Sequence, residues 1–151
     1  MKDYIDKINA LKGLENIIRM KIDYLIDEEK SINIDDIVND KIKVKEVEEK
    51  LKIAICDWKH EYADSLIPIY EGELLSIYAD NIKLLSYAQN VQKYDKDLPI
   101  IEALRQGFYD YLIEELDMLI KSEAKRLIDD YLLTIRENTK RCREWEKEEE
   151  K

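Results

Sequence analysis

The sequence predicts an all-α protein, an elongated bundle of four to five helices with a long C-terminal helix. Apolar residues return every three or four positions from Tyr4 to Ile135. The 151 residues include only 3 Gly and 2 Pro, so the chain cannot form many hairpins or phosphate-binding loops. We expect one helical bundle domain over residues 1–136, followed by a charged helical extension over residues 137–151.

The N-terminal half contains two expected helices. The first runs from Asp3 to Glu28 and turns a regular apolar face to the core, made of Tyr4, Ile8, Leu11, Ile18, Ile22 and Leu25. Residues 29–43 read as a connection, because Ser, Asn and Asp cluster there. Either a short helix from Asp35 or a small hairpin pairing residues 32–34 with 42–44 would fit this connection. The second helix runs from Val44 to Ile67, where Pro68 ends or bends it.

The C-terminal half contains a third helix from Tyr70 to Val91 and a fourth that begins at Pro99, capped by Asp97 or Leu98. Nothing forces the fourth helix to stop before Lys147, which would make it roughly 70 Å long. A compact domain of this size is only about 40 Å across. The helix must therefore break or protrude, and the expected breaks lie near Lys121–Ser122 or Asn138–Thr139.

The predicted core follows from the apolar stripes of these helices. Each core residue lies on the stripe of its own helix. The set comprises Leu51, Ile55, Trp58, Tyr62, Leu85, Leu104, Phe108, Leu112 and Leu119.

The formal net charge is -10, and the acidic excess is concentrated in residues 22–40, 60–82 and 106–120. The last two of these segments contain no Lys or Arg. Because the rest of the chain is basic on balance, the protein is electrically polarised. Direct binding to nucleic acid is disfavoured, since the acidic segments would repel phosphates.

The location follows from the N-terminus and the cysteines. The charged N-terminus lacks the apolar region of a signal peptide, which favours a cytoplasmic protein whose two cysteines, Cys56 and Cys142, are free thiols. No run approaches the roughly 20 apolar residues that cross a bilayer. We expect no membrane segment.

The best cluster of reactive side chains lies on the second helix. Glu49, Cys56, His60 and Asp64 fall on the face opposite the apolar stripe. A structural zinc site needs four converging ligands, and a thiol nucleophile needs a base and an oxyanion hole. Neither set is complete. We interpret the cluster as a solvated or partner-facing stripe and expect no catalytic residue, no cofactor and no metal.

Four carboxylates on the same helix resemble the motifs of a known enzyme family. Glu46-x-x-Glu49 followed by Glu61-x-x-Asp64 is similar to the paired motifs of MazG-type nucleoside triphosphate pyrophosphohydrolases. The resemblance implies an all-α enzyme that holds Mg²⁺ between antiparallel helices. On one continuous helix, Glu49 and Glu61 would instead lie roughly 18 Å apart, too far to share an ion. A carboxylate metal-dependent hydrolase is therefore kept only as an alternative function.

A second pattern, Ile34–Lys52, has the apolar spacing of a helix-turn-helix, with Val44–Lys52 as the recognition helix. Glu46, Glu48 and Glu49 on that helix oppose contact with phosphates. Near the C-terminus, Lys, Arg and Glu alternate from Lys140 onward, a pattern typical of ion pairs within one helix.

The residues expected to bind a partner lie in two places. Tyr62, Tyr70, Tyr78, Tyr87 and Tyr94 recur every seven to nine residues, as at the rim of a bundle or at an interface. Leu132, Leu133, Ile135 and Trp145 are expected to be uncovered at the end of the fourth helix, where a second copy or a partner would shield them. The predicted binding residues are Trp145, Ile135, Leu132, Tyr70, Glu71 and Glu73.

These observations favour a non-catalytic interaction or scaffold subunit, not an enzyme. It would bind a protein partner, or form a homodimer, through an acidic surface that contains Tyr and Trp. A further alternative is an acidic nucleic-acid mimic or inhibitor, whose carboxylates would line up like phosphates and occupy a basic groove on another protein.

Overall fold

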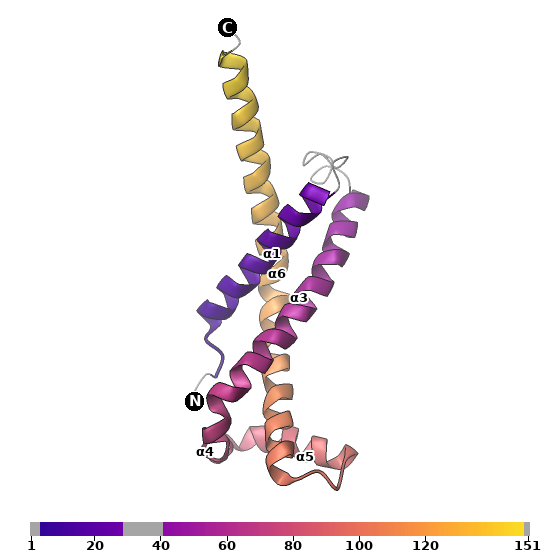
Figure 1. Cartoon of the computed structure of the whole chain (residues 1–151), viewed down its shortest axis with the longest axis vertical. Coiled ribbons are helices and arrows are strands. Elements are labelled where there is room, and N and C mark those ends of the chain that lie inside the picture. The colour runs from indigo at the N-terminus through magenta and orange to yellow at the C-terminus, as the bar shows by residue number, and fades with distance from the viewer. Residues whose placement is uncertain (1–3, 29–40, 150–151) are drawn as a thin grey trace. The chain divides into compact units, whose positions relative to one another are not determined.

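The computed structural model describes residues 4–28 and 41–149, and within these ranges the regular elements are all helical (Figure 1). This confirms the all-α fold. The helices are α1 (Lys7–Glu28), α3 (Lys41–Tyr70), α4 (Leu74–Asp80), α5 (Leu85–Tyr94) and α6 (Ile100–Glu149), with 3₁₀ turns η1 (Glu71–Glu73) and η2 (Ile82–Leu84). None of these helices is long and apolar enough to span a membrane. Residues 29–40 of the expected connection lie outside the described ranges, while residues 42–44 belong to α3, which contradicts the hairpin.

The chain divides into two compact units, and α1, α3 and α6 contribute to both. Unit 1 comprises residues 1–10 and 57–120, and unit 2 comprises residues 11–56 and 121–151. We describe each unit separately. The expected division into a bundle over residues 1–136 and an extension over residues 137–151 stays a prediction.

Phe108 is the centre of the core of unit 1. Its side chain is fully buried, and the rings of Tyr4 and Tyr70 meet it edge-on at 5.8 and 5.9 Å between centroids. Tyr111 stacks on it at 6.4 Å. Edge-on and offset contacts are the favourable geometries for aromatic pairs. The burial of Phe108, and of Trp58, Leu104 and Leu112 around it, confirms those core predictions.

The first helix begins at Lys7, four residues later than expected, because Asp6 caps it. The Asp6 Oδ1 accepts hydrogen bonds from the backbone N–H groups of Ile8 (3.1 Å) and Asn9 (3.3 Å). Tyr4 and Ile5, which precede the cap, are buried. Ile8 lies two positions beyond the cap and is exposed, so its expected core position is wrong.

The expected third helix is interrupted at Asn81. This residue has extended backbone angles, φ -136° and ψ 90°, between α4 and η2. Its N–H donates to the carbonyl of Ile77, and its own carbonyl accepts from Leu84, each at 3.1 Å. Asn is a common turn residue, and the interruption changes the helical phase. Leu84 is therefore buried, whereas Leu85, a predicted core residue, is 38% exposed.

Gly107 allows α5 to cross close to α6 in unit 1. A Cβ atom at this position would lie 2.6 Å from the backbone nitrogen of Ala88 and 2.7 Å from the hydroxyl oxygen of Tyr78. That hydroxyl donates to the carbonyl of Leu104 at 2.6 Å. No side chain could be added at residue 107 without moving backbone.

Unit 2 has an aliphatic core. Buried side chains recur every four residues in α1 at Ala10, Leu14, Ile18 and Ile22, of which the last three lie in this unit. They are joined by Leu51 and Ile55 of α3, both predicted core residues, and by Ile128 and Leu132 of α6. Predicted core residues Tyr62 and Leu119, both in unit 1, are half-buried.

The helix α6 is continuous over 50 residues. The expected breaks at Lys121–Ser122 and Asn138–Thr139 are therefore wrong. Pro68 likewise does not end α3, which continues to Tyr70. Pro99 directly precedes α6, and its carbonyl accepts the first helical bond, from Ala103 at 3.0 Å.

Candidate interaction surface

The reactive side chains predicted on α3 lie on its exposed surface in the part of the chain that the structure describes. Glu49, Cys56, His60 and Asp64 are all exposed, and Cys56 is a free thiol. Over residues 4–28 and 41–149, no group of three or more His, Cys, Asp or Glu side chains could hold a metal ion. Because α3 is a single helix, Glu49 and Glu61 do not lie on two facing helices as the pyrophosphohydrolase motifs require.

His60 has a structural partner. Its Nδ1 lies 2.6 Å from the hydroxyl oxygen of Tyr109, and the two rings stack at 6.1 Å between centroids. The contact joins α3 to α6 within unit 1. At the neighbouring position of α3, the Lys59 Nζ donates to the Asp117 Oδ1 at 2.7 Å. These residues therefore hold the two helices together.

A cluster of tyrosines and carboxylates covers the α5 side of α6. The Tyr87 hydroxyl donates to the Glu114 carboxylate, which together with burial raises the pKa of Tyr87 to about 12. Tyr87 also meets the ring of Tyr111 edge-on at 5.8 Å. Burial, and then the charge of Glu114, raise the pKa of Asp110 above its ordinary value. The cluster is a packed contact between helices, in which Asp110 is less readily charged than a free carboxyl.

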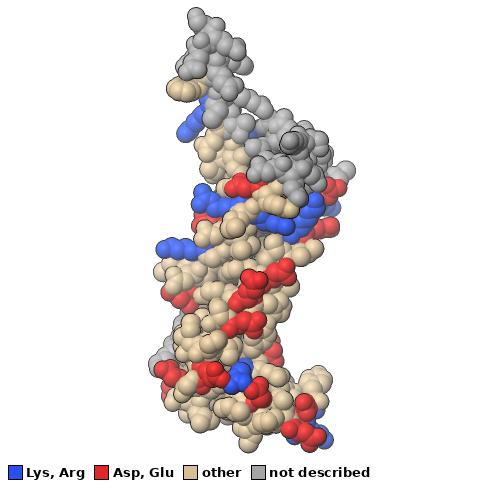
Figure 2. Space-filling model, in the orientation of Figure 1, with Lys and Arg blue, Asp and Glu red and all other residues tan. Residues whose placement is uncertain are grey.

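Unit 1 carries most of the acidic excess of the chain. By sequence it contains 15 acidic and 7 basic residues, against 20 and 18 in unit 2. Figure 2 shows red side chains outnumbering blue ones over the part of the molecule that holds α4 and α5. Arg105 on α6 is one of the few bases there, and it pairs with both Glu71 and Glu102. Glu71 is thus partly neutralised, whereas the surface as a whole stays negative.

Large apolar side chains are uncovered on this acidic unit. Among the described residues, seven of the exposed large apolar side chains lie between residues 69 and 101: Ile69, Leu75, Ile82, Leu85, Tyr94, Ile100 and Ile101. We use the name outer face of α4–α5 for three exposed side chains of this segment, Leu75 of α4, Ile82 of η2 and Leu85 of α5. Leu75 is 71% exposed and Ile82 is 76% exposed. The opposite side of the segment packs into the unit through Leu74, Ile77, Tyr78, Leu84 and Ala88.

The outer face was absent from the sequence predictions, although the sequence contains a signal for it. Leucines are doubled at Leu74–Leu75 and again at Leu84–Leu85. Adjacent residues of a helix point about 100° apart, so a doubled leucine cannot bury both side chains on a narrow contact. The first leucine of each pair is buried and the second is exposed.

The predicted partner-binding residues have different environments in the two units. In unit 1, Glu71 and Glu73 are exposed, while Tyr70 is half-buried because its ring packs against Tyr4 and Phe108. In unit 2, Trp145 is 68% exposed and Ile135 is half-buried.

Leu132 is only 6% exposed, which contradicts the expectation that it is uncovered. Its neighbour Tyr131 shows why. The Tyr131 hydroxyl donates to the Asp23 Oδ1 at 2.5 Å, and Arg19 lies over the ring at 5.4 Å. This part of α6 therefore packs on α1, and whether Leu132 contributes to an interface stays a prediction.

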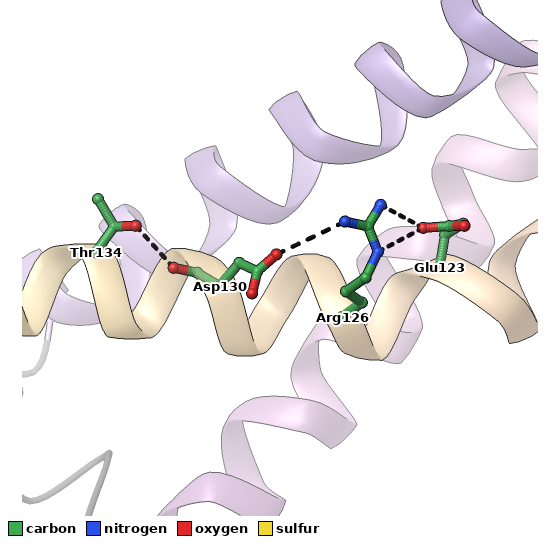
Figure 3. Close-up of polar contacts among 4 residues, drawn as sticks. All are labelled: Glu123, Arg126, Asp130 and Thr134. Carbon is green, nitrogen blue, oxygen red and sulfur yellow. Dashed lines mark hydrogen bonds and ion pairs between the residues drawn. The ribbon is translucent and has the colours of Figure 1, made fainter.

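Charged side chains follow the exposed surface of α6 in unit 2 (Figure 3). Arg126 lies between two carboxylates: its Nε donates to the Glu123 Oε2 at 2.8 Å, and its Nη1 lies 3.8 Å from the Asp130 Oδ2. The Thr134 hydroxyl donates to the carbonyl of Asp130 at 2.8 Å. The two Arg126 ion pairs lie within one helix, and pairs of this kind stabilise a helix by about a few tenths of a kcal/mol each.

Comparison with known proteins gives no relative: no family model, no curated protein and no solved structure matches the chain.

Proposed function

We propose that the chain is a non-catalytic interaction or scaffold protein that binds a protein partner through an acidic surface containing exposed apolar and aromatic side chains. The observation that supports this best is the outer face of α4–α5. Large apolar side chains that are exposed close together in a short segment are typical of binding sites. Here they lie on the unit with 15 acidic and only 7 basic residues.

The side chains that could otherwise support chemistry are used in packing. His60 contacts Tyr109, Tyr87 contacts Glu114, and Lys59 contacts Asp117. An active site would instead combine reactive groups with a pocket and perturbed pKa values. The raised pKa values in unit 1 include those of Tyr78 and Tyr87, which bond to residues of α6, and those of Asp110 and Arg105 on α6 itself.

Two alternative functions are tested by separate experiments. A carboxylate hydrolase predicts tight binding of Mg²⁺ or Mn²⁺, which calorimetric titration of the full chain would detect. A nucleic-acid mimic predicts that an excess of the chain releases DNA from a basic DNA-binding protein. The interaction proposal expects neither result, and expects no gel shift of duplex DNA at about 150 mM salt.

The proposal is tested by affinity capture with the full chain as bait in an extract of its native source. Three baits are compared: the unaltered chain, Trp145→Ala, and Leu75→Lys. We expect at least one protein to be retained by the unaltered chain and to bind it again after purification, with a Kd in the micromolar range or tighter. Failure to recover any protein that binds again in purified form would contradict the proposal.

A further inference from the structure

We propose that the outer face of α4–α5 binds a basic, amphipathic helical segment of a different protein. This inference rests on the proposed function and specifies the partner of one surface. The outer face offers Leu75, Ile82 and Leu85 to solvent within eleven residues of chain. Exposed Ile69, Ile100 and Ile101 lie at the helix ends that flank this segment in the sequence.

The negative charge of unit 1 favours a partner whose binding segment is positively charged. Residues 60–82 carry five acidic residues and no Lys or Arg, and exposed Glu73 and Asp80 precede and follow Leu75 in the sequence. Lys83, between Ile82 and Leu85, is the one exposed base from Leu74 to Leu85. A positive partner would be attracted to this surface and oriented on it. A nucleic acid would be repelled. A second copy of the chain is also disfavoured, because it carries a net charge of -10 itself.

The secondary structure limits the form of the partner. An extended peptide is commonly bound by adding a strand to the edge of a sheet, and the described residues contain no strand. Recognition at α4–α5 must therefore depend on side chains. A helix presents apolar side chains at positions i, i+3, i+4 and i+7 on one face, which matches a surface of separated Leu and Ile side chains. Lys and Arg on the flanks of that helix would meet Glu73 and Asp80.

The experiment tests which charge and which apolar spacing the chain prefers in a helical peptide. A display library of helical peptides of varied charge is selected on the full chain at about 50 mM salt. The enriched peptides are then synthesised beside scrambled peptides of the same composition. We expect enriched sequences to be basic with apolar residues at helical spacing, the scrambled peptides to bind about tenfold more weakly or worse, and affinity to fall as salt rises.

Point variants locate the binding surface. Leu75→Lys and Ile82→Lys should each weaken the selected peptides about tenfold or more, because a lysine removes apolar contact and repels a basic helix. Ile53→Lys makes the same change at an exposed isoleucine of unit 2 and should leave the affinity unchanged. If a lysine variant has a lowered thermal midpoint, Leu75→Ala and Ile82→Ala replace it, with a smaller loss of affinity expected.

Several outcomes would overturn the inference: no enriched peptide, acidic or neutral enriched peptides, equal binding by scrambled peptides, or an equal loss in Ile53→Lys. A dimer that light scattering detects and that Leu75→Lys abolishes would assign the surface to a second copy instead. If a captured protein binds the chain but is insensitive to Leu75→Lys and Ile82→Lys, this inference fails while the proposed function stands. If no protein binds at all, the proposed function fails as well.

Discussion

Units 1 and 2 are both built from α1, α3 and α6, yet different interactions hold them together. Unit 1 contains ten of the thirteen aromatic residues of the chain, and its polar side chains connect one element to another, as in the pairs Lys59–Asp117 and Tyr78–Leu104. Unit 2 has an aliphatic core, and the Arg126 ion pairs lie within a single helix, while the bond from Tyr131 to Asp23 joins α6 to α1. The regular apolar spacing of its helices accounts for much of the core of unit 2. The core of unit 1 depends more on particular aromatic and polar contacts.

The surfaces of the units differ in the same way. Unit 2 is nearly balanced, with 20 acidic and 18 basic residues, while unit 1 has 15 and 7. A long-range field that attracts a basic partner therefore originates mainly in unit 1. Contact between copies of the chain would meet less repulsion at unit 2, where Trp145 is exposed.

The largest expected effect is that of Phe108→Ala, which removes the centre of the aromatic core of unit 1. We expect a loss of about 3–5 kcal/mol in the free energy of unfolding, measured by urea denaturation. Tyr94→Ala is the control, because Tyr94 is 94% exposed in the same unit. A Phe108 variant as stable as the Tyr94 variant would contradict the aromatic core.

Gly107→Ala should have the next largest effect, a loss of about 1–3 kcal/mol in the free energy of unfolding. The added methyl group would lie 2.6 Å from the backbone of Ala88, which cannot rotate away. Gly72→Ala provides a matched control, since nothing lies within 4 Å of its added Cβ and its φ is not positive. That variant should be neutral or slightly more stable. Thermal unfolding of the two variants tests whether α5 and α6 approach closely at Gly107, and equal midpoints would show that they do not.

Tyr87 in unit 1 and Tyr131 in unit 2 both have a pKa raised to about 12, for different leading reasons. The hydrogen bond to Glu114 is the largest cause for Tyr87, whereas burial is the largest for Tyr131, followed by the bond to Asp23. Glu114→Gln should therefore lower the pKa of Tyr87 by more than Asp23→Asn lowers that of Tyr131. Alkaline titration of phenolate absorbance, with Tyr→Phe variants for assignment, measures both.

The same shifts affect stability at high pH. Because the folded-state pKa lies above the ordinary value of 10.0, each tyrosine contributes stability that is present below pH 10 and is lost as the pH rises through about 12. Tyr87→Phe should accordingly flatten the decline in stability over this window. An unchanged pH profile in that variant, together with an equal response of the two tyrosines to their carboxylate variants, would contradict the assigned causes.

The smallest effect is expected for Asp110→Asn, which should stabilise the protein by less than about 1 kcal/mol at neutral pH. Burial and the charge of Glu114 raise the pKa of Asp110 above 3.8. The folded state then holds the proton more tightly, so stability falls as the pH rises through the folded-state pKa. The advantage of the Asn variant should vanish near pH 3. Asp129→Asn in unit 2 serves as the control, and an Asp110 variant that is less stable at pH 7 would rule out this account.

Periodicity predicted the helical class and much of both cores, because residues such as Leu51, Phe108 and Leu112 lie on regular stripes. It failed where a polar residue that caps or interrupts a helix changed where the helix begins or ends. Asp6 displaced the start of α1, and Asn81 divided the third helix. The outer face could not be located from the sequence, because the turn at Asn81 changes the helical phase and buries Leu84 instead of Leu85. Packing against α1 likewise buries Leu132, a contact between distant segments that no local pattern reveals.

The central claim is that this chain acts by binding protein, and the molar mass of the purified chain in solution tests it most directly. Light scattering is measured on the full chain alone over a wide concentration range, and again after mixing with each protein recovered by capture. The account predicts a species heavier than the single chain of 18.1 kDa, as a stoichiometric complex or as a dimer that Trp145→Ala weakens. A mass of one chain at every concentration, with each candidate eluting separately, would contradict it.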